Sequence, residues 1–98
     1  MFDVRFHPDA ATEYEEAICW YAERSEQVAE NFDQVVSQAL EQIIQSPSRC
    51  PMIDGRHRIF ILPKKFPYHI IYRVDSETVT VLAVAHHRRK PSYWQGRA

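Results

Sequence analysis

The chain has 98 residues, enough for one domain with a single hydrophobic core and too few for two. Hydrophobic residues make up 45% and charged residues 26%, which excludes a disordered or fibrous chain, and two cysteines without a CxxC motif give no disulfide framework. The net charge of −1 conceals a division: residues 1–45 carry ten acids and two bases, whereas residues 46–98 carry three acids and ten bases. If the halves form different faces, the basic face attracts phosphate or acidic protein; alternatively, the two faces simply pair with each other.

The first half of the chain predicts a short strand and two helices. Apolar and polar residues alternate over 2–6, as in a half-buried strand, and Pro8 follows as a helix start signal. Apolar residues at steps of three and four predict helices over 8–24 and 28–45, and the short link between them implies an antiparallel helical hairpin. We expect Trp20 and Tyr21 to pack in the core.

The second half predicts three strands, over 56–62, 68–74 and 78–86. The last is apolar on both faces, which is typical of a central strand covered on both sides. The fold class is therefore α+β, with the order β-α-α-β-β-β in one domain spanning 1–98 and the helical hairpin packed on one face of an antiparallel sheet. The other face must be polar, or covered by residues 87–98 or by a partner.

Ordered motifs along the chain resemble those of ParE/RelE toxins. Arg58 followed by FPYHIIYRV at 66–74 is similar to the family pattern R…FPY-x-I-x-YR, and VLAVAHHRRKP at 81–91 is similar to I-x-A-V-x-H-x-R-R-x-P. The aromatic pair at 93–94 matches the usual end of the family. The sequence FHPDAA at 6–11 and the Trp-Tyr pair at 20–21 resemble its plasmid-stabilisation branch. The resemblance extends over nearly the whole chain.

This resemblance implies the toxin of a type II toxin–antitoxin system, held inactive in the cytoplasm by a cognate antitoxin protein. ParE-like members inhibit DNA gyrase, whereas RelE-like members cut messenger RNA on the ribosome without a metal. The His-x-Arg-Arg-x-Pro ending and the absence of an acid at 59–62 favour the gyrase inhibitor, which is not an enzyme. The alternatives are a ribosome-dependent endoribonuclease and a non-catalytic nucleic-acid-binding module. We expect no cofactor, and neither a signal peptide nor a membrane span is predicted.

The candidate site residues lie in the basic second half. In a RelE-like enzyme, His86 would transfer protons, Arg73 and Arg89 would hold the phosphate, and Tyr93 would stack on a base or donate a proton. The predicted target- or phosphate-binding surface comprises Arg58, Lys64, Lys65, Arg73, Arg88, Arg89 and Lys90.

Each of these residues has a purely structural alternative. Arg58 and Arg73 could pair with helix acids such as Glu13, residues 88–90 could form a solvated run, and His86 could be satisfied by a backbone carbonyl. His87 should face away from His86, because neighbouring strand residues alternate, and the histidines lack zinc-type spacing, so no metal site is expected.

Overall fold

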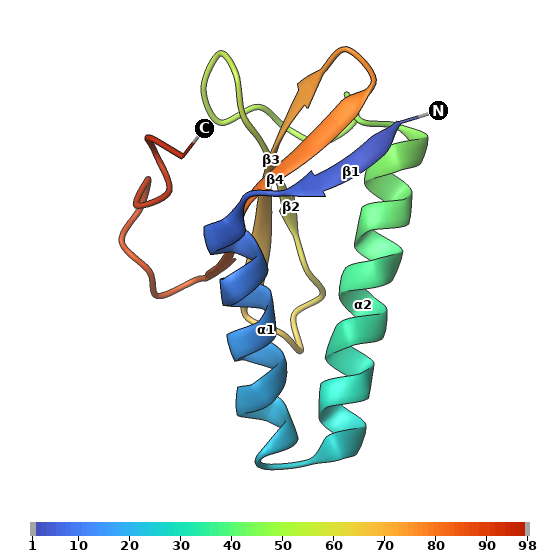
Figure 1. Cartoon of the computed structure of the whole chain (residues 1–98), viewed down its shortest axis with the longest axis vertical. Coiled ribbons are helices and arrows are strands. Elements are labelled where there is room, and N and C mark those ends of the chain that lie inside the picture. The colour runs from blue at the N-terminus through green and yellow to red at the C-terminus, as the bar shows by residue number, and fades with distance from the viewer. Residues whose placement is uncertain (1, 98) are drawn as a thin grey trace.

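The computed structural model of the chain describes residues 2–97. Within that range the elements are β1 (Asp3–Phe6), α1 (Pro8–Ala22), α2 (Glu26–Gln45), β2 (Arg58–Ile61), β3 (Tyr68–Asp75) and β4 (Thr78–His86). The predicted order β-α-α-β-β-β is confirmed, and the predicted bounds differ from the observed ones by at most two residues. The two helices form an antiparallel hairpin on one face of the sheet, and residues 87–97, called the tail below, run beside α1 (Figure 1).

The sheet of the described chain has the order β1-β4-β3-β2. The ladders β2–β3 and β3–β4 are antiparallel as expected, but β1 pairs in parallel with β4, so the sheet is mixed rather than wholly antiparallel. Local sequence could not reveal this difference, because both helices and two strands separate β1 from β4 and no tight turn fixes their relative direction. The central position of β4 agrees with its apolar sequence.

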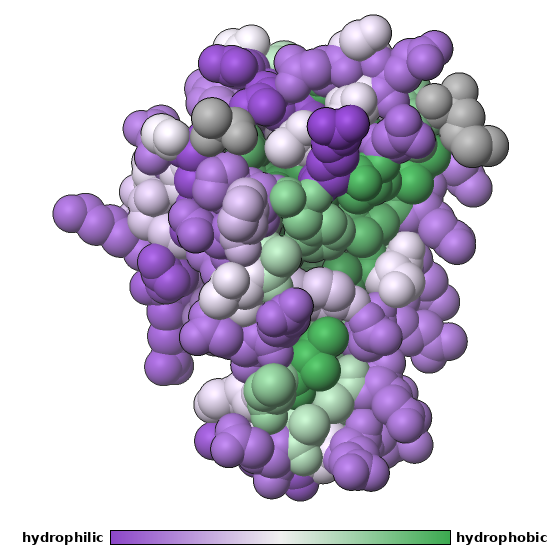
Figure 2. Space-filling view, in the orientation of Figure 1, coloured by the Kyte–Doolittle hydropathy of each residue, from purple (hydrophilic) through white to green (hydrophobic). Residues whose placement is uncertain are grey.

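Both helices begin with side-chain caps. The ring Nδ1 of His7 accepts from the N–H of Asp9 beside Pro8, and the Ser25 hydroxyl accepts from the N–H of Val28. The apolar stripes of the two helices face each other and the sheet. Figure 2 shows hydrophobic atoms reaching the surface as a band along the helical seam, between hydrophilic outer faces. Neither helix contains a lysine or arginine, so the outer surface of the hairpin is acidic.

Two apolar clusters sandwich the sheet. The larger lies under the helices, where Phe32 contacts the rings of Tyr21 and Phe66 at centroid distances of 5.2 Å. The smaller lies on the other face, where the tail brings Trp94 over β3 and β4, leaving that side chain 4% exposed. The tail therefore covers the second face of the sheet, one of the options that the sequence left open.

A β-bulge in β4 changes which residues face the helices. The register between β3 and β4 shifts at Ile71/Tyr72, which leaves Leu82 without a directly opposed partner. Val81 before the bulge and Val84 after it both join the cluster under the helices, whereas Leu82 joins the cluster on the opposite face. The bulge therefore reverses the alternation of β4, so that Val84 and His86 face α1 while Ala83 and Ala85 face the opposite side.

Candidate functional site

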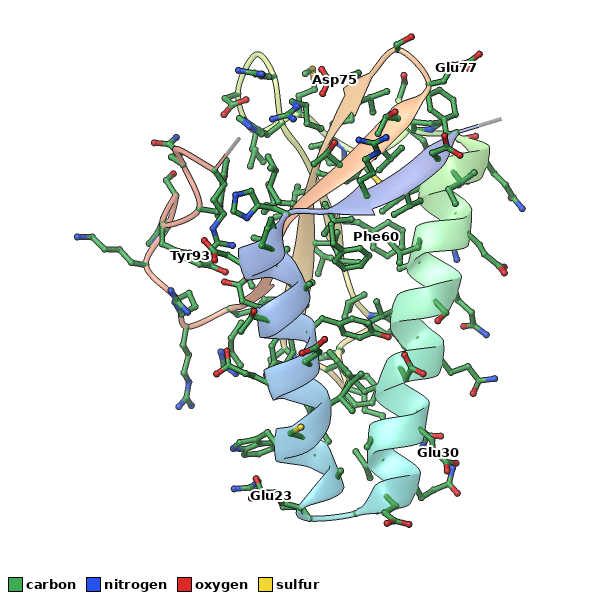
Figure 3. All side chains as sticks on the ribbon, in the orientation of Figure 1. Glu23, Glu30, Phe60, Asp75, Glu77 and Tyr93 are labelled. Atoms are coloured by element: carbon green, nitrogen blue, oxygen red, sulfur yellow. The ribbon has the colours of Figure 1, made fainter. Side chains whose placement is uncertain are left out.

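A groove of about 400 Å³ lies between α1, the ends of β3 and β4, and the tail. Its floor and walls are mainly aromatic and aliphatic, with a few charged groups at the rim. Its lining residues are Glu13, Glu16, Ala17, Trp20 and Tyr21 from α1, Pro67 from the turn before β3, Tyr68, Val84 and His86 from the sheet, and Arg89 and Tyr93 from the tail. Figure 3 shows Tyr93 between the tail and α1. Of the predicted site residues, His86, Arg89 and Tyr93 are thus brought together.

His86 reaches the groove because the bulge shifts the alternation of β4 by one residue, which places His86 on the same face as Val84. Its ring meets that of Tyr68 edge-to-face at 5.1 Å, and its Nδ1 accepts a hydrogen bond from the backbone N–H of Arg88 at 3.0 Å. Burial, followed by the charges of Arg88 and His87, lowers the pKa of His86. The ring is therefore neutral near pH 7, with Nε2 carrying its proton. It contacts a backbone group, although an amide donor rather than the carbonyl acceptor that we considered.

Arg89 and Tyr93 form one wall of the groove. The guanidinium carbon of Arg89 lies 3.9 Å from the centre of the Tyr93 ring, a cation–π contact on the exposed side of the tail. The Tyr93 hydroxyl donates to Oε2 of Glu13 at 2.7 Å. Burial and the Glu13 carboxylate raise the pKa of Tyr93 far above its ordinary value. The Tyr93 hydroxyl consequently stays protonated and keeps its hydrogen bond to Glu13.

Glu13 and Arg97 join α1 to the tail at one end of the groove. Arg97 donates to both carboxylate oxygens of Glu13, at 3.1 and 3.0 Å, and to the carbonyl oxygen of Leu82 at 2.8 Å. The backbone N–H of Val84 donates to Glu13 at 3.0 Å. The side chains of Glu13 and Arg97 are only 12% and 14% exposed. Sequence reasoning considered Glu13 only as a partner for Arg58 or Arg73 and did not consider Arg97.

Trp20 lies at the far end of the groove and is 49% exposed. The expectation that it packs in the core is therefore wrong, while Tyr21 beside it does pack against the core. Trp20 lies near the C-terminal end of α1, and Arg24 stacks on its ring at 3.6 Å. An exposed tryptophan at the mouth of a groove is a common feature of protein-binding surfaces.

The structure separates the predicted basic surface into two ends of the sheet. Arg58 is the first residue of β2 and lies opposite Tyr72 of β3. Arg73 follows Tyr72 in β3 and forms an ion pair with Asp75 at 2.5 Å. Arg58 donates instead to backbone carbonyls of the preceding loop. Neither contacts a helix acid, so the proposed pairing with Glu13 is wrong. Both arginines lie far from His86, because they occupy the opposite end of the sheet.

The other basic residues lie near the end of β4. Lys64 and Lys65 belong to the exposed turn before β3, which begins opposite His86, and Arg88 and Lys90 are exposed in the tail. His87 lies on the opposite face from His86, as predicted, and stacks on His69 at a centroid distance of 5.3 Å.

Between residues 2 and 97, no three His, Cys, Asp or Glu side chains lie close enough together to hold a metal ion. No helix in the same range is long and apolar enough to cross a membrane.

Comparisons with known proteins decide the family. The model of the family described as "ParE toxin of type II toxin-antitoxin system, parDE" matches residues 4–91. The chain belongs to the ParE toxin family. The resemblance found in the sequence is thereby confirmed. A chain of the solved structure "Chromosomal ParDE TA system from P. aeruginosa" superposes with a TM-score of 0.73 at 16% identity, covering 88% of this chain and 96% of that one, which supports the same fold. A comparison with curated protein sequences found no match.

The sequence did not indicate two groove residues of this ParE family member, Glu13 and Trp20, or Arg97, which pairs with Glu13. One signal was present, because Glu13, Ala17 and Trp20 are spaced by four and three and therefore share a face of α1 that borders its main apolar stripe at Ala17. No local signal pointed to Arg97, whose partner Glu13 is 84 positions away in the chain.

Proposed function

We propose that this ParE family toxin acts in the cytoplasm by binding and inhibiting DNA gyrase, and that a cognate antitoxin protein neutralises it. The observation that carries the proposal is the groove beside α1, with its exposed Trp20, aromatic walls and the stacked Arg89–Tyr93 pair. Aromatic residues and arginine are the groups most enriched at protein–protein contacts. An apolar groove beside a sheet also suits an amphipathic helix from a partner.

The groove is poorly equipped for RNA cleavage. Metal-free cleavage needs a base, an acid and several cations around one phosphate. Among the described residues that line the groove, Arg89 is the one guanidinium, and the carboxylates of Glu13 and Glu16 line the same groove. Tyr93 is held as a donor to Glu13, and Arg73 lies at the other end of the sheet. These facts favour binding without chemistry.

Inducing the chain alone in bacteria tests the target. We expect loss of plasmid supercoiling with intact transcripts, and inhibition of purified gyrase by the purified chain. Rapid transcript cleavage with normal supercoiling would overturn the proposal and favour the endoribonuclease.

His86→Asn provides a second discriminator. A nuclease that transfers protons through His86 loses nearly all activity in this variant, by about a factor of 10²–10⁴. A binding toxin loses only one of many contacts, so its inhibition of gyrase should weaken by about tenfold or less. Copurification of the chain with the product of the neighbouring reading frame tests the antitoxin.

A further inference from the structure

Glu13 is a nearly buried carboxylate of α1 that accepts hydrogen bonds from three residues, one in β4 and two in the tail. The backbone N–H of Val84 donates to Oε1 at 3.0 Å, the Tyr93 hydroxyl donates to Oε2 at 2.7 Å, and Arg97 donates to both oxygens. Burying a carboxylate costs free energy unless such partners satisfy it. The arrangement therefore holds α1, β4 and the tail together at one point.

Arg97 supplies the complementary half of this contact. Its Nη1 donates to the carbonyl oxygen of Leu82 at 2.8 Å as well as to Glu13, and its Nε lies 3.8 Å from Oδ2 of Asp9. A bidentate arginine–carboxylate pair fixes orientation as well as charge. Arg97 thus ties the last described part of the tail to the bulge of β4.

These contacts lie where β4 extends past its neighbouring strand. β1 ends at Phe6, which pairs with Val81, whereas β4 continues to His86. The Leu82 carbonyl and the Val84 N–H lie on this extension, where a longer β1 would have offered backbone partners. Glu13 provides an acceptor and Arg97 a donor in place of that missing strand.

We propose that Glu13 and Arg97 form a clamp that completes the edge of β4 and positions the tail wall of the groove, including Arg89 and Tyr93. The groove is complete only while the clamp is intact. Breaking the contacts between Glu13 and Arg97 releases the tail from the second face of the sheet and removes one wall of the groove. Its geometry stands alone, but its consequence for toxicity rests on the proposed function. Glu13 and Arg97 are positioning residues, because they act through Tyr93 and Arg89.

Trp94 reports directly on the state of the clamp. The chain has two tryptophans, so Trp20→Phe leaves the buried Trp94 as the single tryptophan, whose emission can be excited selectively over that of the tyrosines. In that background we expect Arg97→Ala to raise acrylamide quenching of Trp94 several-fold and to speed amide exchange at Val84 by about tenfold, while the helical circular dichroism stays unchanged. Arg56→Ala, at an exposed arginine outside the groove, is the control. Trp94 remaining protected after Arg97→Ala would overturn the clamp.

Substitutions of Glu13 separate the contribution of its acceptor oxygen from that of its charge to holding the tail. Glu13→Gln keeps an oxygen for the Val84 N–H but loses the bidentate ion pair, so we expect intermediate quenching of Trp94. Glu15→Gln, on the exposed side of the same helix, should leave quenching unchanged. If Glu15→Gln matches Glu13→Gln, general helix charge rather than the clamp holds the tail.

A charge exchange separates the clamp from an ordinary ion pair. Glu13→Arg combined with Arg97→Glu keeps one positive and one negative group, but places a donor against the Val84 N–H and an acceptor against the Leu82 carbonyl. We therefore expect the tail to remain detached in this double variant. Wild-type protection of Trp94 in the double variant would overturn the claim that the pair replaces a strand.

Growth arrest upon induction supplies the functional readout. At equal levels of folded protein, we expect Arg97→Ala to reduce toxicity by about tenfold and Arg97→Lys, which keeps one charged donor, to restore part of it. Full toxicity with a detached tail would overturn the positioning role. If the wild-type chain arrests no growth, the proposed function fails, while quenching and exchange still decide whether the clamp exists.

Discussion

Arg58 donates from Nη1 to the carbonyl oxygen of Cys50 at 2.7 Å, so the start of β2 holds the loop that precedes it. The same nitrogen donates to the carbonyl of Ser48 at 3.0 Å, and the buried Tyr72 donates its hydroxyl to the carbonyl of Pro47 at 2.7 Å. Two long side chains from neighbouring strands thus satisfy three carbonyls of the loop after α2. Arg58 belongs to the family motif, and in this chain its visible role is to anchor a loop.

Arg58→Ala should therefore act on stability. Hydrogen bonds from a charged group contribute about 1.5–3 kcal/mol, and we expect a loss of this size in the free energy of unfolding measured with urea. Lys64→Ala, at an exposed residue, should change it by less than about 0.5 kcal/mol. An Arg58→Ala chain as stable as wild type but without toxicity would return Arg58 to the target surface and contradict the anchoring role.

Truncation of the two tryptophans should lower the stability of the fold by very different amounts. Trp94 is 4% exposed, packs over β3 and β4, and meets the His57 ring at 4.8 Å, so Trp94→Ala should cost about 3–5 kcal/mol of stability. Trp20 is 49% exposed, so Trp20→Ala should cost about 1 kcal/mol or less. Thermal unfolding of both variants measures the contrast. Equal losses would mean that the tail does not cover the second sheet face.

Local patterns were sufficient to predict most of the fold. The alternation of residues 2–6 has the period of a strand, and the apolar stripes of both helices have the period of an α-helix. The apolar residues on both faces of Thr78–His86 correctly indicated a central strand. The parallel pairing of β1 and the bulge at Leu82 were not predictable, because both depend on how distant segments meet.

The candidate site was predicted only in part, for the same reason. His86, Arg89 and Tyr93 are close in sequence and meet in the groove. Arg58 and Arg73 looked equivalent to them by charge alone, but strand register carries both to the opposite end of the sheet. Charge composition therefore indicated that a basic region exists without indicating how it is divided.

Acid should destabilise the fold through His69, which stacks on His87 in a pocket that Arg89 and Lys90 also line. Burial, and then the His87 charge, lowers the pKa of His69 in the folded chain. Because the unfolded chain takes up that proton more readily, stability falls as the pH drops below about 6.5 and the loss is complete below the folded pKa. His86, whose pKa is also lowered, contributes in the same direction.

Midpoints of thermal unfolding between pH 7.5 and 5 measure this effect. His69→Gln cannot be protonated, so its midpoint should fall less on acidification than that of wild type. The two proteins should differ least in their pH slope above pH 7, where His69 is neutral in both states. Identical slopes below pH 6.5 would show that His69 does not drive the loss.

Arg88 and Arg89 offer a matched pair for the groove itself. Both are exposed tail arginines, but only Arg89 lines the groove and stacks on Tyr93 at 3.9 Å, whereas Arg88 does not line it. If a partner binds in the groove, Arg89→Ala should weaken growth arrest or gyrase inhibition by about tenfold, as expected for the loss of a contact that contributes ~1.4 kcal/mol. Arg88→Ala should weaken either effect by less than about threefold. Neither variant should alter the unfolding midpoint, because both side chains are exposed. Equal losses in the two variants would instead mean that the basic run of residues 88–90 acts through its total charge. In that case, high salt should weaken partner binding by about tenfold, and to the same extent for Arg88→Ala and Arg89→Ala.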